Sequence, residues 1–125
     1  MTDQIDFMDR LTAVAAARGL YRPDAYLFVW EALERTATLV GEKRHVSGDE
    51  LLDGIRDLAR SRFGPMAKDV FNAWGVTTTG DFGRVVFDLV EGGLLRKTEE
   101  DSLEDFADRF DFQREFVDEY FRGRV

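Results

Sequence analysis

The chain has 125 residues, of which 44% are hydrophobic and 34% are charged, and its net charge is −8 at pH 7. This length fits one domain with its own core, and the apolar content is too high for a disordered chain. Because the chain contains no cysteine, disulfides, thiolate metal sites and thiol catalysis are excluded. The negative charge disfavours nucleic acids and anionic membranes as partners, since both are polyanions.

The first two predicted elements are helices joined by a short connection. In the first helix, apolar residues recur at helical spacing at Ile5, Met8, Leu11 and Ala15. Gly19 fits the position just past the end of this helix. Pro23 suits the first position of the next helix, where Asp24 is placed to oppose the positive end of the helix dipole.

The second helix, over residues 23–40, is predicted to be the central one. Its apolar residues occupy two faces and leave only a narrow polar stripe. A helix that is apolar on most sides is usually a buried one. We therefore expect the large side chains of Phe28, Trp30 and Leu33 to be buried in the core.

Two more helices are predicted after this one. Ser47 followed three residues later by Glu50 is a capping box, in which each side chain accepts a hydrogen bond from the other residue's backbone. Apolar residues continue this helix to Phe63, where a Gly-Pro pair breaks the chain. A short helix is then expected to end at Gly75.

The next helix is predicted over residues 82–90, with Thr78 as its cap and Asp81 as the capping partner. The sequence after Gly93 favours a short strand. The predicted fold class is therefore mostly α, as one compact domain of several helices. A finer expectation is a winged-helix-like arrangement over residues 44–112, with a small β-hairpin after the glycines.

The winged-helix likeness would make residues 82–90 the recognition helix. Its predicted outer residues are Gly83, Arg84, Asp88 and Glu91. A recognition helix needs hydrogen-bond donors for base edges and cations for phosphates. This face carries one cationic and two anionic side chains. We therefore expect the winged-helix topology to be present without DNA binding.

The C-terminal part of the chain is acidic and aromatic. The last 28 residues carry 10 acidic and 4 basic side chains, so most of the excess negative charge lies there. We divide the chain into a helical domain over 1–112 and a segment over 113–125 that docks on it. Residues 113–121 are predicted to form an amphipathic helix with Phe116 and Tyr120 on the docking side. A helix this short needs a surface to fold against, which belongs to the same chain, to a second subunit or to a partner. We favour the same chain, because so many exposed rings would otherwise invite aggregation.

Arg56 and Arg60 lie one helical turn apart and form a candidate basic patch. The acidic side of the docked tail can reach them and so cover a site for a partner. We favour the other interpretation, which is local pairing with Asp53, Asp57 and other nearby carboxylates, because surface arginines usually pair in this way. The candidate interaction residues are accordingly Arg56, Arg60, Phe116 and Tyr120.

Catalytic signals in the sequence are weak. The single histidine, His45, lies between Arg44 and a helix cap, where a loop role is far more common than catalysis. No nucleophile elbow, histidine pair or phosphate-binding glycine loop is present. The acidic run from Glu99 to Asp108 offers oxygen ligands for a hard cation, but its spacing is not that of a calcium loop. We predict no catalytic residue, no metal and no cofactor.

Several stretches of the sequence are similar to a family of short bacterial proteins. They are YRPDAYLFV at residues 21–29, RHVSG at 44–48, DFG at 81–83 and LVEGGLLRKTEEDS at 89–102. The resemblance extends over roughly residues 20–112. That family carries no assigned activity, so the resemblance implies a group and supplies no site residues.

The leading functional hypothesis is a non-catalytic module that binds or regulates another protein. The alternative is a winged-helix DNA-binding regulator, and the third hypothesis is an enzyme that uses carboxylates and a divalent metal. The N-terminus lacks the cationic start and apolar stretch of a signal peptide, and no apolar run is long enough to cross a bilayer. We therefore expect a bacterial cytoplasmic protein with no membrane partner.

Overall fold

The structure is a computed structural model that describes residues 2–40, 46–95 and 106–122. These residues are mostly helical and compact, which confirms the predicted fold class. The α-helices are α1 (Thr2–Arg18), α2 (Pro23–Val40), α3 (Gly48–Phe63), α4 (Ala67–Ala73), α5 (Thr79–Glu91) and α6 (Glu119–Arg122). A 3-10 helix, η1 (Gly64–Met66), precedes α4, and a π-helix, η3 (Gln113–Asp118), precedes α6.

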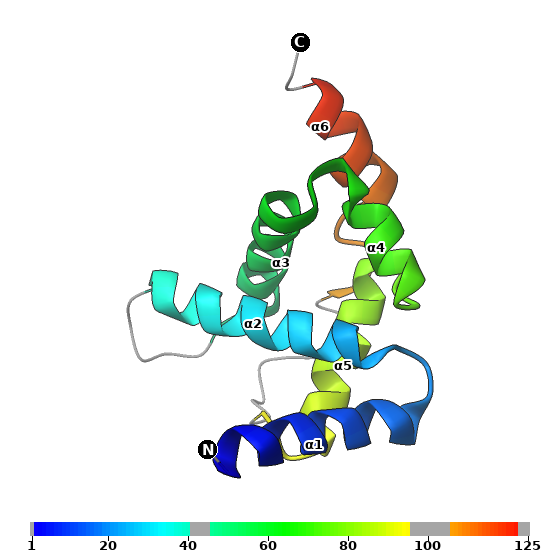
Figure 1. Cartoon of the computed structure of the whole chain (residues 1–125). Helices are drawn as coiled ribbons and strands as arrows, with labels where there is room; N and C mark the ends of the chain where they lie inside the picture. Colours follow the sequence, from blue (N-terminus) through cyan, green and yellow to red (C-terminus); the bar gives the residue numbers. More distant parts are fainter. Residues whose placement is uncertain (1, 41–45, 96–105, 123–125) are drawn as a thin grey trace.

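Helices α1 and α2 form an antiparallel pair, and α2 crosses α3 and α5 (Figure 1). Helix α4 and the C-terminal helices η3 and α6 lie at the end of the molecule opposite α1 (Figure 1). Within the described parts of the chain, no helix is both long and apolar enough to cross a membrane.

The helix boundaries follow the local chemistry of the sequence. Helix α2 begins at Pro23, and α1 ends just before Gly19, which adopts a positive φ of 69°. At the start of α3, the Ser47 backbone N–H donates to Glu50 Oε1 at 3.0 Å, and the Glu50 N–H donates to Ser47 Oγ at 3.2 Å. The predicted capping box is therefore confirmed.

One glycine sets how closely two helices approach. Gly54 lies inside α3, where a Cβ atom would overlap the side chain of Thr36 on α2. The Thr36 hydroxyl turns inward along its own helix and donates to the Ala32 carbonyl at 2.7 Å. A glycine inside a helix costs stability relative to alanine, so its place at this crossing is explained by close packing.

One hydrophobic core runs through the described residues, from Leu11 on α1 to Phe116 on η3. Phe71 on α4 is fully buried near its centre. Its ring lies 5.1–6.2 Å, centroid to centroid, from the rings of Phe28, Phe63, Trp74, Phe82, Phe112 and Phe116. Edge-to-face pairs at such distances add to the free energy gained by burying the rings.

The prediction for the central helix is correct for Phe28 of α2 and wrong for Trp30 and Leu33. Phe28 is buried as expected, but Trp30 and Leu33 are only half-buried. Trp30 is covered on one side by Phe7 of α1, with ring centroids 4.6 Å apart. Trp30 and Leu33 therefore lie where neighbouring elements cover α2 only in part.

The predicted β-hairpin is not supported. The structure contains no strand in residues 2–40, 46–95 and 106–122. The chain after α5 forms a turn instead, in which the N–H groups of Leu94 and Leu95 both donate to the Leu89 carbonyl, at 2.9 and 3.2 Å. Residues 96–105, where the rest of the hairpin was expected, lie outside the described residues.

Replacing Phe71 with alanine should lower the free energy of unfolding by about 3–5 kcal/mol, because it removes a ring that six others contact. Urea denaturation followed by circular dichroism measures this change. Phe87→Ala is the matched control, since Phe87 is exposed on α5; it should change the free energy of unfolding by less than about 1 kcal/mol. Equal losses in the two variants would contradict the central role of Phe71.

Candidate interaction surfaces

The structure brings Arg56 and Arg60 of α3 together on one carboxylate of the C-terminal segment. Glu115 Oε1 accepts from Arg56 Nη1 at 3.1 Å and from Arg60 Nη2 at 2.6 Å. Arg60 Nη2 also donates to the backbone carbonyl of Glu115 at 3.1 Å. The Glu115 side chain is only 16% exposed, so this pairing is more sheltered than an ordinary surface ion pair.

The local pairing considered for these arginines is present in part. Arg56 Nη2 also donates to Asp53 Oδ1 at 2.7 Å, one turn away on the same helix. Asp57 pairs with Arg35 of α2 instead, at 3.2 Å. The Arg56 guanidinium lies 5.6 Å from the centre of the Phe110 ring, within cation–π range. We call Arg56, Arg60 and Phe110 the Arg56–Arg60 face.

Phe116 is not a surface residue. It is fully buried, and its ring packs against Phe71 and Phe112 at 5.5 and 5.6 Å. The segment predicted as one amphipathic α-helix is wound as a π-helix over 113–118 before it becomes α-helical. Phe121 is half exposed, and the side chain of Tyr120, predicted on the docking side, lies outside the described residues.

The other sequence-based candidates give no site in the described residues. His45 and the acidic residues of 99–105 lie outside them. Asp108 is exposed in a turn with a positive φ of 50°. Among the residues that the structure describes, no group of three histidine, aspartate or glutamate side chains is placed to hold a metal ion.

The predicted outer face of α5 is wrong at two of its four residues. Gly83 is buried, and a Cβ there would overlap the Phe106 ring. Asp88 is also buried and contacts Arg18 of α1, with its Oδ1 3.1 Å from Arg18 Nε. Asp88 is turned toward Arg18 of α1 and Tyr26 of α2, and Gly83 is covered by Phe106.

Two buried tyrosine–aspartate pairs join the start of α2 to α5. The Tyr21 hydroxyl donates to Asp81 Oδ1 at 2.6 Å, and the Tyr26 hydroxyl donates to Asp88 Oδ2 at 2.7 Å. Asp81 also accepts from the backbone N–H of Thr77 at 2.9 Å. Among the described residues, every buried side-chain polar atom has a hydrogen-bond partner, so these pairs hold α5 to α2 and to the loop before it.

The environment shifts the ionisation of these pairs. Burial and the bond to Asp81 raise the pKa of Tyr21 to about 12. For Asp81, burial acts to raise the pKa, but the hydrogen bonds from Tyr21 and from the backbone of Thr77 and Thr78 outweigh it. The pKa of Asp81 is therefore lowered from its ordinary value of 3.8.

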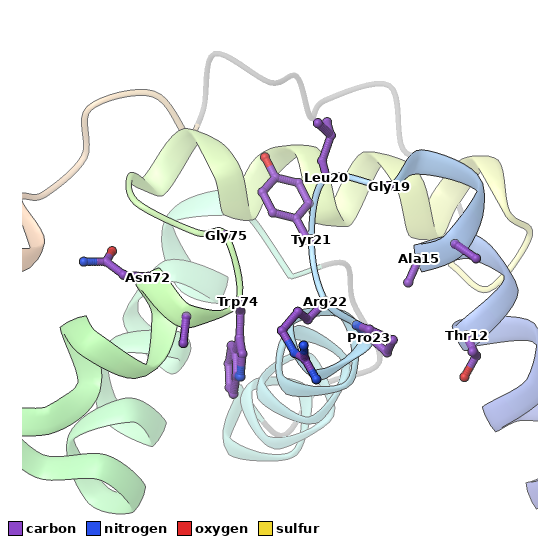
Figure 2. A pocket seen from close by; sticks show the side chains of 12 residues that line it. Thr12, Ala15, Gly19, Leu20, Tyr21, Arg22, Pro23, Asn72, Trp74 and Gly75 are labelled. Carbon is purple, nitrogen blue, oxygen red and sulfur yellow. The ribbon is translucent and has the colours of Figure 1, made fainter.

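A second surface feature is a hollow of about 490 Å³ between α1, the loop before α2 and the end of α4 (Figure 2). Its lining includes alanines of α1 together with Pro23, Asn72 and Trp74. Arg22 lies beside Trp74 in the hollow, and Leu20 stands at its edge (Figure 2). The sequence carries no local pattern for this hollow, because its two sides are about fifty residues apart in the chain.

The loop that borders this hollow is fixed by close backbone contacts. The Arg22 backbone N–H donates to the Trp74 carbonyl at 3.0 Å. Gly75 follows with a φ of 92°, and a Cβ there would lie 2.7 Å from the Leu20 carbonyl oxygen. Only glycine fits this position without strain, so the shape of the hollow is set by the backbone.

No family model, curated protein or solved structure matches this chain. The resemblance to a family of short bacterial proteins therefore stays a prediction.

Asp81→Asn should destabilise the protein at neutral pH by about 1–3 kcal/mol, because a charged acceptor of several hydrogen bonds is lost. The folded pKa of Asp81 is below the unfolded one, so its contribution is present above the unfolded pKa and is lost as the pH falls through the folded pKa. Thermal melts from pH 7 to about pH 2 should show the two proteins converging in acid. Asp69→Asn, at an exposed aspartate of α4, should follow the wild type throughout; a gap that widens in acid would contradict the assignment.

Gly75→Ala should lower the free energy of unfolding by about 1–3 kcal/mol, because the new methyl group meets the Leu20 carbonyl and the backbone has a positive φ. Gly80→Ala is the matched control. A Cβ at Gly80 makes only an ordinary contact of 3.5 Å with Thr78 Oγ1, so this change in helix α5 should be neutral or slightly stabilising. Chemical denaturation of both variants tests the comparison.

Proposed function

We propose that the protein is a non-catalytic module that binds another protein through the Arg56–Arg60 face, which its own C-terminal segment covers. The observation that carries the proposal is that one oxygen of Glu115 accepts from both guanidinium groups. An arginine pair beside an aromatic ring is a combination common at the energetic centres of protein interfaces. The covering segment thus acts as an internal ligand for its own domain.

The chemistry of this internal ligand defines the partner. A carboxylate residue, Glu115, is followed at once by a ring, Phe116, that fills a core pocket. Because Phe116 stays in the core, a partner segment would carry an acidic residue that replaces only the Glu115 carboxylate between the two arginines. Bidentate or shared arginine contacts favour a carboxylate over neutral acceptors, because charge-assisted hydrogen bonds are the stronger ones.

The winged-helix alternative receives no comparable support. The predicted wing is not found in the described residues, and two residues of the predicted recognition face are buried. The net charge of −8 also opposes contact with phosphates. The proposed partner is therefore a protein. The experiment below would also detect binding that depends on nucleic acid.

Removing the Glu115 carboxylate should strengthen partner binding. Loss of hydrogen bonds worth about 1.4 kcal/mol would raise the affinity of the face for an acidic partner about tenfold. Glu115→Ala should therefore retain more of a protein partner in an affinity pull-down from cell extract than the wild type does. The double variant Arg56→Ala/Arg60→Ala should retain none.

Arg35→Ala is the control for loss of a surface arginine, since Arg35 pairs with Asp57 away from Glu115; it should behave as the wild type. A parallel arm treated with nuclease separates the hypotheses. A partner that survives the treatment supports a protein-binding module, and one that disappears supports a nucleic-acid-linked function instead. Equal capture by the Glu115 and double-arginine variants would refute the proposed face.

A further inference from the structure

The hollow beside the α1–α2 loop carries an apolar knob next to an apolar depression. Leu20 is 65% exposed, which is more than any other large apolar side chain among the described residues. It stands at the edge of a hollow that Trp74, Pro23 and several alanines line (Figure 2). Exposed leucine beside a half-buried tryptophan is apolar surface that a partner can remove from water.

The charges at this hollow are few and of both signs. Of the twelve residues that line it, Arg22 is the one charged residue. Asp24 lies next to it, with Oδ2 at 3.8 Å from Arg22 Nε, and the two side chains are 57% and 67% exposed. An exposed pair at this distance gains little from its own contact. Both charges therefore remain available to groups on another molecule.

This pattern is self-complementary. Two copies related by a two-fold axis present the same patch to each other, so residue i of one copy meets residue j of the other and the reverse. Leu20 projects beside the hollow, and Arg22 lies beside Asp24. Each feature therefore has its complement on the same face, as a two-fold interface requires. The hollow also lacks the acidic surplus of a chain with a net charge of −8, so two copies meet here without facing carboxylates across the hollow.

We propose that this face binds a second copy of the same chain, with Leu20 of each copy in the hollow of the other and Arg22 of each facing Asp24 of the other. The face is already fixed in shape, because the Arg22 N–H bonds to the Trp74 carbonyl and Gly75 packs on the loop. Rigid faces lose less conformational entropy on binding. This dimer face shares no residue with the Arg56–Arg60 face and does not depend on the function proposed for it.

Charge-swapped variants of the full chain test the arrangement. In Arg22→Asp the two copies would oppose aspartates across the axis, and in Asp24→Arg they would oppose arginines. Each variant alone should raise the dimer dissociation constant about tenfold or more, since like charges at an interface are unfavourable. An equimolar mixture of the two variants should regain dimers, because each new charge then faces its opposite.

The measurement is sedimentation velocity across a wide range of protein concentration, with the wild type dimerising as concentration rises. Leu20→Asp should be monomeric at every concentration. Met66→Asp is the control, since Met66 is an exposed apolar residue (57%) that does not line the hollow; it should dimerise as the wild type does. Thermal melts of each variant show that the fold is kept, as expected for exposed positions. A wild type that stays monomeric, or a variant mixture that fails to regain dimers while both single variants fold, would overturn the proposal.

Discussion

The packing of rings around Phe71 is the contact on which the other elements depend. Its ring neighbours come from α2, α3, α5 and η3, from Trp74 just after α4 and from Phe112 just before η3, so one side chain joins most elements of the core. Helix α4 is only seven residues long, and an isolated helix of that length is unstable in water. It persists because its buried face lies at the centre of this cluster. The short helix and the ring cluster therefore stabilise each other.

Rings alone do not fix how helices are registered, because apolar contacts have little directional preference. The polar layer between α2 and α5 supplies that direction. Tyr21 and Tyr26 each reach one aspartate of α5, at 2.6 and 2.7 Å, so a shift of either helix would leave buried carboxylates without donors. Arg18 extends the layer to α1 through its contacts with Asp88 and Glu91. The ring cluster thus supplies most of the stability, and the polar layer fixes the register of the helices.

The sequence predicts where the helices of this fold begin and end better than it predicts which of their side chains are buried. Helix starts at Pro23 and Ser47 are set by neighbouring residues, so local patterns found them. Burial of Trp30 depends on which helix lies opposite, and periodicity carries no such information. The same reason explains why Asp88 was taken for an outer residue of α5. Of the candidate residues, Arg56 and Arg60 were found from their spacing, whereas the hollow joins Leu20 to Trp74 across the chain and has no local signal.

The two surfaces differ in what a partner must overcome. The hollow is open, and its shape is set by backbone contacts, so a second copy meets it as it is. The Arg56–Arg60 face is partly covered, with the Arg56 and Arg60 side chains 34% and 41% exposed, and the covering segment is anchored by Phe116 in the core. Expelling that ring would cost about as much as a large core truncation, which few partners can offset. The free-energy cost to an acidic partner is smaller if Phe116 stays in the core and only the Glu115 side chain is displaced. Glu115 lies in the π-helical stretch Gln113–Asp118, and π-helical turns are rare and frequently found at functional sites. Under the proposed function, the partner's apparent affinity is its intrinsic affinity multiplied by the fraction of molecules in which Glu115 is withdrawn from the two arginines.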